Sequence, residues 1–113
     1  MKLELITAGQ DTATRPTPLL FVHGAWHGAW CWQAHFIPFF TRAGFAVHAL
    51  SLRGHGGRTV HGSSDGRAGL RWHAIADYVT DLASVAAGLR PAPVLIGHSM
   101  GGLVVQKYLE RGP

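Results

Sequence analysis

The chain has 113 residues, which allows one domain. Hydrophobic residues make up 47% and charged residues 14%, a composition typical of a folded domain and not of a disordered chain. The formal net charge is +4, but the arginines are scattered, so we expect no nucleic-acid binding. No apolar run approaches the roughly 18 residues of a membrane span, and a charge within the opening residues argues against a signal peptide. The single cysteine, Cys31, can form no internal disulfide, so we expect a cytoplasmic protein.

Short apolar runs alternate with helical patterns in the first half of the chain. Alternation near the start, with Leu3 and Leu5 as its apolar residues, predicts a half-buried strand. The continuous apolar run 18–22 predicts a strand buried on both faces. Aromatic residues at helical spacing predict a helix over 30–40, kinked or broken at Pro38 and ending near Gly44. A further strand is predicted over 45–50.

The second half begins with a glycine-rich loop over 53–69. Apolar residues at steps of three and four then predict an amphipathic helix over 72–89, with Asp77 and Asp81 in the half where the helix dipole favours acids. A buried strand over 93–96 and a helix over 103–109 follow. Strands that alternate with helices predict an α/β fold, with a mostly parallel sheet and helices on both faces.

A serine flanked by glycines lies between the last strand and the last helix. The segment Gly97-His98-Ser99-Met100-Gly101 has the form G-x-S-x-G. Small residues at both ends let the chain turn sharply, which holds Ser99 strained above the strand end with its hydroxyl exposed. The following helix adds the positive end of its dipole and the N–H of Met100. This context predicts a nucleophile, and a glycine-rich turn without chemistry is the competing interpretation.

The strand 18–22 also ends in a glycine turn, His23-Gly24-Ala25-Trp26. A serine that attacks an ester carbonyl needs two hydrogen-bond donors for the developing oxyanion. Met100 N–H is one, and Gly24 lets the backbone come close enough to supply the other. We predict Ala25 N–H as this second donor, with Trp26 N–H as the alternative. In the competing interpretation the segment is a plain turn whose histidine is satisfied by backbone groups.

Three segments together resemble the α/β-hydrolase superfamily: 23–30 (HGAWHGAW), 53–56 (RGHG) and 97–102 (GHSMGG). They occur in the family's order and at similar spacings, and the first is most similar to the small esterase, lysophospholipase and hydroxynitrile-lyase-like branches. The resemblance implies a cofactor-free serine hydrolase of small ester substrates, in which Ser99 forms an acyl-enzyme. The family often has Asp at the position of Ser51. The implied site residues are Ser99 as nucleophile, Ala25 and Met100 as oxyanion hole, and His23, Gly24, Gly97, His98 and Gly101 as supporting residues.

The family's catalytic order is Ser, then Asp or Glu, then His. Beyond Ser99 this sequence has Glu110 but no histidine. We therefore expect residues 1–113 to be the N-terminal part of a single α/β-hydrolase domain, truncated after the helix that follows the nucleophile and catalytically incomplete as given. His55 is the least remote internal substitute for the missing base. Without a base, Ser99 is a weak nucleophile at neutral pH.

Other kinds of site find little support. His23 and His27 lie in a glycine loop with no carboxylates at matching spacing, so no metal site is predicted. The glycines of 54–57 lack the lysine of a phosphate-binding loop. The tryptophans are expected mainly in the core, and Trp26 is the strongest candidate for contact with a substrate.

Two alternatives to the hydrolase remain open. The chain can be a non-catalytic fragment that acts, if at all, as an interaction module, or part of a lyase on the same scaffold that uses the same serine for proton transfer. In either case the strand 94–96 is expected at an open, hydrophobic sheet edge. Such edges recruit other chains, so self-association is a further expectation.

Overall fold

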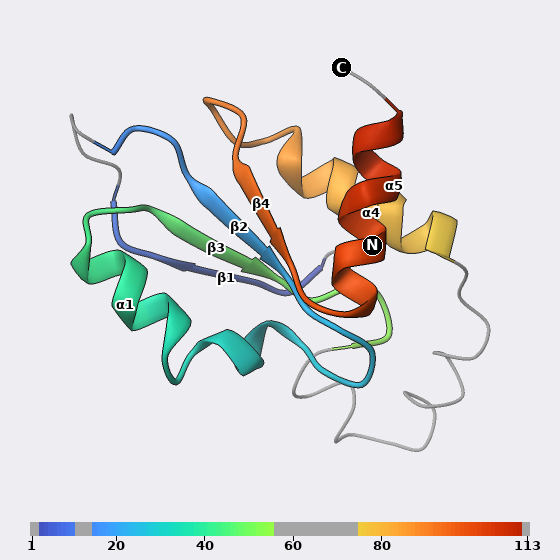
Figure 1. Ribbon diagram of the computed structural model, residues 1–113, viewed down its shortest axis with the longest axis horizontal. Helices are drawn as coiled ribbons and strands as arrows, with labels where there is room; N and C mark the ends of the chain where they lie inside the picture. The colour runs from blue at the N-terminus through green and yellow to red at the C-terminus, as the bar shows by residue number, and fades with distance from the viewer. Residues whose placement is uncertain (1–2, 11–14, 56–74, 112–113) are drawn as a thin grey trace.

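The computed structural model describes residues 3–10, 15–55 and 75–111 (Figure 1). From β2 onward, strands alternate with helical segments along the chain. In order the elements are β1 (Leu5–Ala8), β2 (Leu19–Val22), the 3-10 helix η1 (Ala29–Trp32), α1 (Phe36–Arg42), β3 (Val47–Leu50), α4 (Ile75–Ala86), β4 (Val94–Gly97) and α5 (Met100–Glu110).

The four strands form one sheet in the order β1-β3-β2-β4. The strand β2 pairs in parallel with both β3 and β4, with Phe21 opposite Ala49 and Ile96. Only β1 runs antiparallel, against β3. The sheet is therefore mostly parallel, as predicted, and β4 lies at its edge among the described residues.

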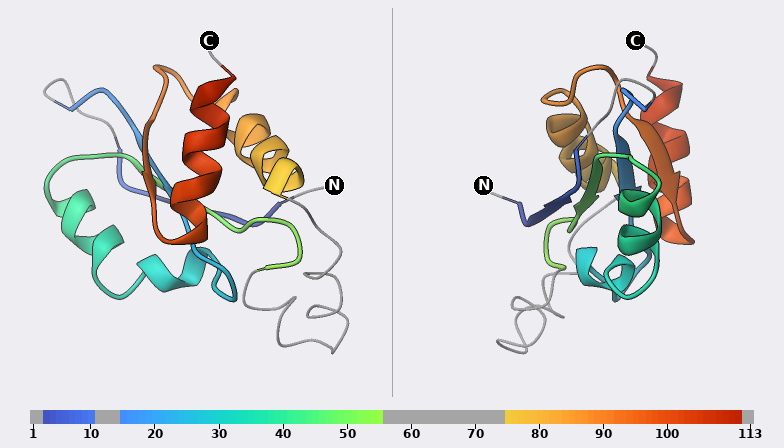
Figure 2. Two further views of the ribbon diagram at one scale, coloured as in Figure 1. Left: turned by 45° about the vertical axis from the view of Figure 1, so that its right-hand side comes forward. Right: turned by 90° about the vertical axis from the view of Figure 1, so that its left-hand side faces the viewer.

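Helices cover both faces of this sheet, which confirms the predicted α/β architecture. In the left view of Figure 2, α1 lies on one side of the strands and α4 and α5 on the other. Because side chains alternate along a strand, β2 contributes to two cores. Leu20 and Val22 pack with α4 and α5, whereas Leu19 and Phe21 pack with η1 and α1. All four of these residues are buried, as the continuous apolar run predicts.

The strand β1 only partly follows the prediction. Leu5, expected on the buried face, is 40% exposed, whereas Ile6 and Ala8 pack against the core beside η1 and α1. The strand β1 lies at the sheet edge, whereas α5 packs mainly over β4 and β2, so β1 is less well covered on this face. Leu3, just before the strand, does pack against the core beneath α4 and α5.

The helix predicted over 30–40 consists of two short helices, η1 and α1, but the break lies at 33–35 and not at Pro38. Pro38 is the third residue of α1, where the backbone N–H has no partner within the helix, so proline is tolerated. The predicted end near Gly44 is confirmed. Gly44 has φ +95°, and the N–H groups of Gly44 and Phe45 donate to the carbonyls of Thr41 and Phe40.

The last two helices differ from the prediction at their ends. The helix α4 ends at Ala86, short of the predicted 89, and the predicted start at 72 lies outside the described residues. The helix α5 begins at Met100 and not at 103, because Gly101 and Gly102 take helical conformations directly after Ser99. Most of the loop predicted over 53–69 also lies outside the described residues.

Candidate active site

Ser99 lies at the turn between β4 and α5, at the carboxyl end of the parallel strands. Its backbone has φ 57° and ψ −121°, a conformation that costs energy for a residue with a side chain. The residue is exposed, and its side chain makes no capping hydrogen bond to α5. Strain of this kind persists only where the surrounding structure enforces it, and at Ser99 it holds a hydroxyl free above the sheet.

Two glycines let the chain make this turn. A Cβ at Gly97 would lie 2.6 Å from the carbonyl oxygen of Gly101, and a Cβ at Gly101 would collide with the carbonyl of Val22 on β2. Helix α5 therefore begins in direct backbone contact with the central strand. Any side chain at these two positions would push the helix and Ser99 away from the sheet.

The loop after β2 packs directly against this turn. A Cβ at Gly24 would lie 3.1 Å from the Cβ of Ser99, so glycine brings the backbone of this loop alongside the serine. Ala25 follows on the surface, and Trp26 has φ +68° and is 56% exposed. The structure thus brings together the two segments that the sequence singled out.

Two backbone donors of these segments are unused within the described residues. Neither Ala25 N–H nor Met100 N–H donates a hydrogen bond to any part of the chain that the structure describes. By contrast, Gly101 N and Gly102 N already donate to the carbonyls of His98 and Ser99. Within the described residues both N–H groups are thus unpaired, and their role as oxyanion donors stays a prediction.

His23 is buried and fully hydrogen-bonded. Its Nε2 accepts from Leu52 N at 3.0 Å, which leaves Nδ1 to donate to the Gly24 carbonyl at 2.7 Å. Burial lowers the pKa of His23 to about 4, so the ring is neutral at neutral pH. With both nitrogens occupied, His23 joins the ends of β2 and β3 and is not available as a base.

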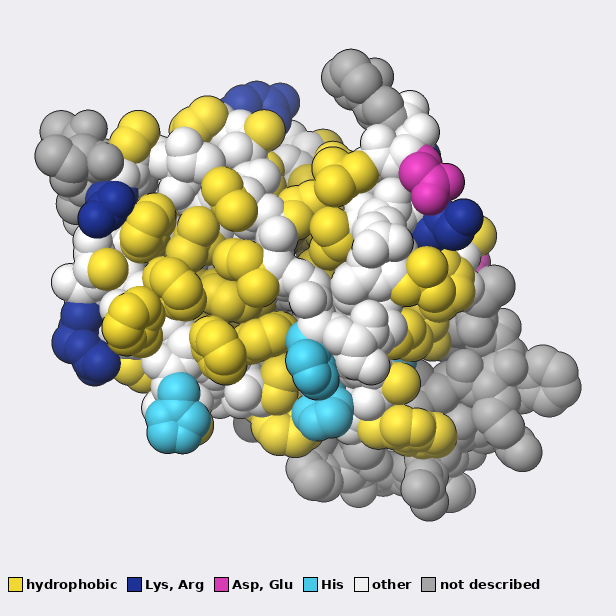
Figure 3. Space-filling model, in the orientation of Figure 1, with side chains coloured by type: hydrophobic (Ala, Val, Ile, Leu, Met, Phe, Trp, Pro, Cys, Tyr) yellow, Lys and Arg dark blue, Asp and Glu magenta, His cyan; other side chains and the backbone are white. Residues whose placement is uncertain are grey.

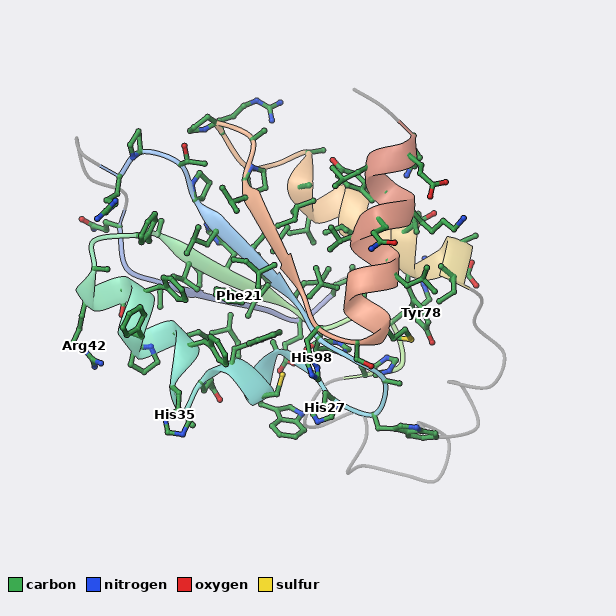
Figure 4. The ribbon with its side chains drawn as sticks, viewed as in Figure 1. Phe21, His27, His35, Arg42, Tyr78 and His98 are labelled. Carbon is green, nitrogen blue, oxygen red and sulfur yellow. The ribbon has the colours of Figure 1, made fainter. Side chains whose placement is uncertain are left out.

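The other described histidines near the turn hydrogen-bond to backbone carbonyls or contact aromatic rings. His27 Nδ1 donates to the Ala25 carbonyl at 2.9 Å, and the rings of His27 and His98 meet edge to face with centroids 6.4 Å apart (Figure 4). His55 is buried, with Nδ1 3.1 Å from the Arg53 carbonyl. Within residues 3–10, 15–55 and 75–111, no side chain hydrogen-bonds to the Ser99 hydroxyl. His61 and His73 lie outside these residues.

An ion pair that sequence reasoning missed fixes the chain after β3. Asp81, buried on α4, accepts from the backbone N of Arg53 at 2.8 Å and from its guanidinium at 2.8 and 3.0 Å. Asp77 adds a longer contact of 3.7 Å. The hydrogen bonds with Asp81 raise the pKa of Arg53. The sequence explained both acids by the helix dipole, but their spacing of four residues also places them on one face, which was the available signal.

A second missed network surrounds Ser51, directly after β3. Its hydroxyl donates to a carboxylate oxygen of Glu4 at 2.5 Å and accepts from Ala29 N at 2.9 Å. Ser51 N also donates to the Glu4 carbonyl at 2.9 Å. The start of the chain, the end of β3 and the start of η1 thus meet at one buried hydroxyl. Nothing in the local sequence pattern connects residues so far apart.

Two other features are missing from the part of the chain that the structure describes. No three His, Cys, Asp or Glu side chains gather there where they could hold a metal ion. No helix in it has the length and apolar character needed to cross a membrane.

A mostly parallel sheet between helices, with a strained serine at a strand-to-helix turn, is typical of hydrolases of the α/β class. The model of the alpha/beta hydrolase family matches residues 19–112, and the chain belongs to this family.

Similar proteins include esterases. The chain is 35% identical over 103 residues to methyl jasmonate esterase 1 of Vitis vinifera, covering 88% of this chain and 36% of that protein. It is 37% identical over 87 residues to protein phosphatase methylesterase 1 of Bos taurus, covering 76% of this chain and 22% of that protein. The solved structure of a monoacylglycerol lipase of Paleococcus ferrophilus superposes with a TM-score of 0.70 at 26% identity, covering 98% of this chain and 38% of that one. The chain thus spans between about a fifth and two fifths of these relatives.

Proposed function

We propose that Ser99 is the nucleophile of a carboxylic ester hydrolase. The observation that carries this proposal is the Ser99 backbone, held at φ 57° by the contact of Gly97 and Gly101 with the helix and the central strand. The exposed hydroxyl attacks the ester carbonyl, the alcohol leaves, and water then hydrolyses the acyl-enzyme. The esterase relatives support esters as the substrate class, and the methyl jasmonate esterase supports a small-molecule ester.

The oxyanion of the tetrahedral intermediate is bound by the N–H groups of Ala25 and Met100 in this proposal. Both are unused within the described residues, and both belong to segments that meet at Ser99. The positive end of α5 adds to the field at this point. Trp26, 56% exposed beside Ala25, is the residue proposed to contact the substrate.

The catalytic acid and base come from another part of the protein in this proposal. No described side chain hydrogen-bonds to Ser99, and the relatives are about three to five times as long as the matched segment. We therefore propose that residues 1–113 form the N-terminal part of one hydrolase domain and need its remainder for turnover. The lone cysteine, Cys31, fits a cytoplasmic protein.

The test replaces Ser99 by Ala in the full-length protein and measures hydrolysis of p-nitrophenyl acetate and labelling by a fluorophosphonate. We expect kcat to fall by about 10⁴-fold or more and labelling to vanish. Ser84→Ala is the matched control, because the Ser84 hydroxyl only donates to the Asp81 carbonyl within α4. Turnover that survives in Ser99→Ala but is lost on changing another residue would overturn the assignment.

The residue 1–113 segment alone is proposed to self-associate through β4. Val94 N and His98 N donate to the β2 side at 2.9 and 3.1 Å, so the alternation of a parallel ladder directs the N–H and C=O of Leu95 to the open side. Val94 is 51% exposed there, and hydrophobic side chains gather over β4 and α1 (Figure 3). Such an edge pairs readily with another chain.

Sedimentation velocity of the 113-residue chain tests this proposal. We expect concentration-dependent association that Val94→Lys weakens and Leu109→Lys, at an exposed position of α5, does not. A monodisperse monomer across the concentration range would contradict the proposal.

A further inference from the structure

The loop that carries Ala25 is held at both ends by two consecutive residues of the strand-end segment after β3. At its first end, His23 accepts a hydrogen bond from Leu52 N at 3.0 Å. At its last end, Ala29 N donates to the Ser51 hydroxyl at 2.9 Å. Ser51 and Leu52 therefore form a clamp for residues 23–29, and the position of Ala25 N–H depends on both contacts.

The Ser51 contact replaces a cap that the loop itself does not provide. Ala29 is the first residue of η1, and the preceding residue, Gly28, has no side chain to bond an N–H at the start of the helix. Ala29 is fully buried, so an unpaired N–H there would carry a desolvation cost. The Ser51 hydroxyl, 1% exposed, satisfies this donor from across the fold.

Glu4 determines which way the Ser51 hydroxyl points. A serine hydroxyl has one proton to donate, whereas an ionised carboxylate can only accept. The 2.5 Å contact with Glu4 therefore commits the Ser51 proton to the carboxylate and leaves the hydroxyl oxygen as acceptor for Ala29 N. Hydrogen bonds between a hydroxyl and a carboxylate are short and strong, which matches this distance. The backbone bond from Ser51 N to the Glu4 carbonyl, 2.9 Å, holds the two residues in register.

We infer that Glu4 and Ser51 are positioning residues for the oxyanion loop. The carboxylate orients the hydroxyl, the hydroxyl holds Ala29 N, and the fixed start of η1 sets the path of residues 24–28 beside Ser99. This inference rests on the proposed function, because it takes Ala25 N–H as an oxyanion donor. The contacts themselves are independent of any catalytic role.

The experiment exchanges the charge between the two positions. Four proteins are compared with the parent: Glu4→Gln, Ser51→Ala, Ser51→Asp and the double variant Glu4→Gln with Ser51→Asp. In the double variant, the carboxylate introduced at position 51 accepts directly from Ala29 N, and the amide introduced at position 4 can donate to it. In Ser51→Asp alone, two carboxylates face each other and repel. Glu110→Gln and Ser84→Ala are matched controls at exposed or helix-bonded positions outside this network.

The first readout is amide hydrogen exchange of Ala29, with Phe21 on the central strand as the reference for global opening. We expect exchange at Ala29 to rise by roughly tenfold relative to Phe21 in Ser51→Ala, which removes the acceptor of Ala29 N. In Glu4→Gln and Ser51→Asp an acceptor remains but is no longer oriented by the hydroxyl–carboxylate bond, so we expect a smaller rise of about threefold or more. The double variant should return to within about twofold of the parent. Glu4→Gln changes an exposed side chain, so it keeps the test valid if Ser51→Ala fails to fold.

The second readout is ester hydrolysis by the full-length protein. We expect kcat to follow the protection of Ala29 across the parent and its four variants while KM stays within about twofold, because an oxyanion donor acts in the transition state. If Glu4→Gln leaves Ala29 exchange unchanged, or if Ser51→Asp alone protects as well as the double variant, the positioning role of Glu4 is wrong. If Ser99→Ala retains turnover, the proposed function fails instead. Exchange at Ala29 then still shows whether Glu4 and Ser51 hold the start of η1. If Ser99 is the nucleophile but kcat does not follow Ala29 protection, the clamp has no role in catalysis.

Discussion

The turns that follow β2 and β4 meet beside Ser99, but they are held in place by opposite means. The turn after β2 is fixed by side-chain hydrogen bonds. His23 accepts from Leu52 N and donates to the Gly24 carbonyl, His27 donates to the Ala25 carbonyl, and the Ser51 hydroxyl accepts from Ala29 N. The turn after β4 has no capping side-chain bond at Ser99. It depends on close backbone contacts that only glycine allows at positions 97 and 101.

This difference matches what each turn has to do. The serine turn needs its side chain free, so close backbone packing must hold it. The loop after β2 presents a backbone N–H, so its side chains are free to fix its shape. The serine turn should therefore be sensitive to added atoms, and the loop to removed hydrogen bonds.

The largest expected effect is at the serine turn. Gly101→Ala places a Cβ against the carbonyl of Val22, and backbone atoms on both sides leave little room to adjust. We expect a loss of about 3–5 kcal/mol in the free energy of unfolding, measured by urea denaturation. Gly102→Ala is the control: its Cβ meets nothing nearer than 3.8 Å, so the helix should gain about 0.5–1 kcal/mol. Equal effects of the two changes would contradict the packing account.

The next effect is at the loop, and it depends on pH. Because the folded pKa of His23, about 4, lies below its unfolded value near 6.5, the unfolded state takes up the proton first as pH falls. The contribution of neutral His23 is thus present in full above about pH 6.5 and is lost as pH falls towards 4, a change on the order of 3 kcal/mol.

His23→Gln should remove most of this pH dependence and cost about 2 kcal/mol at pH 7, because a flexible amide does not replace both imidazole bonds, to Leu52 N and to the Gly24 carbonyl, at once. Urea denaturation at pH 7, 6, 5 and 4 measures both quantities. His35→Gln, at an exposed position before α1, is the control and should leave the free energy of unfolding unchanged at each pH. If the free energy of unfolding changes with pH equally in the parent and in His23→Gln, another group causes the pH dependence.

The smallest effect is also at the loop. His27→Gln removes the hydrogen bond from Nδ1 to the Ala25 carbonyl, which lies at the surface. Water can replace this bond, so we expect a loss of only about 0.5 kcal/mol in the same denaturation experiment. A loss as large as that of His23→Gln would mean that exposed and buried hydrogen bonds of this loop contribute equally to the free energy of unfolding.

Much of this arrangement could be predicted from the sequence, because its signals are local. The apolar runs predicted β2, β3 and β4, and the glycines around Ser99 predicted a strand-to-helix turn. The contacts of Glu4 with Ser51 and of Arg53 with Asp81 could not be predicted, since they join residues 47 and 28 positions apart. Such pairs follow from the order of strands in the sheet, and periodicity carries no information about which polar side chains meet across it.

The misplaced features have local causes as well. Leu5 was expected inside because alternation indicates which residues share a face, not whether a helix covers that face. Pro38 was expected to break a helix, but the chain broke just before it, which left the proline in the first turn of α1. The functional roles of Ser99, Ala25 and Met100 stay predictions until the variants above are measured.

The central place of β2 has a consequence for how the protein is made. Its partner β3 lies less than 30 residues further along the chain, whereas its partner β4 lies about 75 residues further. A ribosome releases these segments in order, so β1, β2 and β3 leave the exit tunnel long before β4 does. Until then the side of β2 that carries the Val22 carbonyl has no neighbouring strand, and a chaperone that binds extended apolar segments can bind there. Ser99 directly follows β4 in the chain, so the serine turn forms in the same step in which β4 pairs with β2.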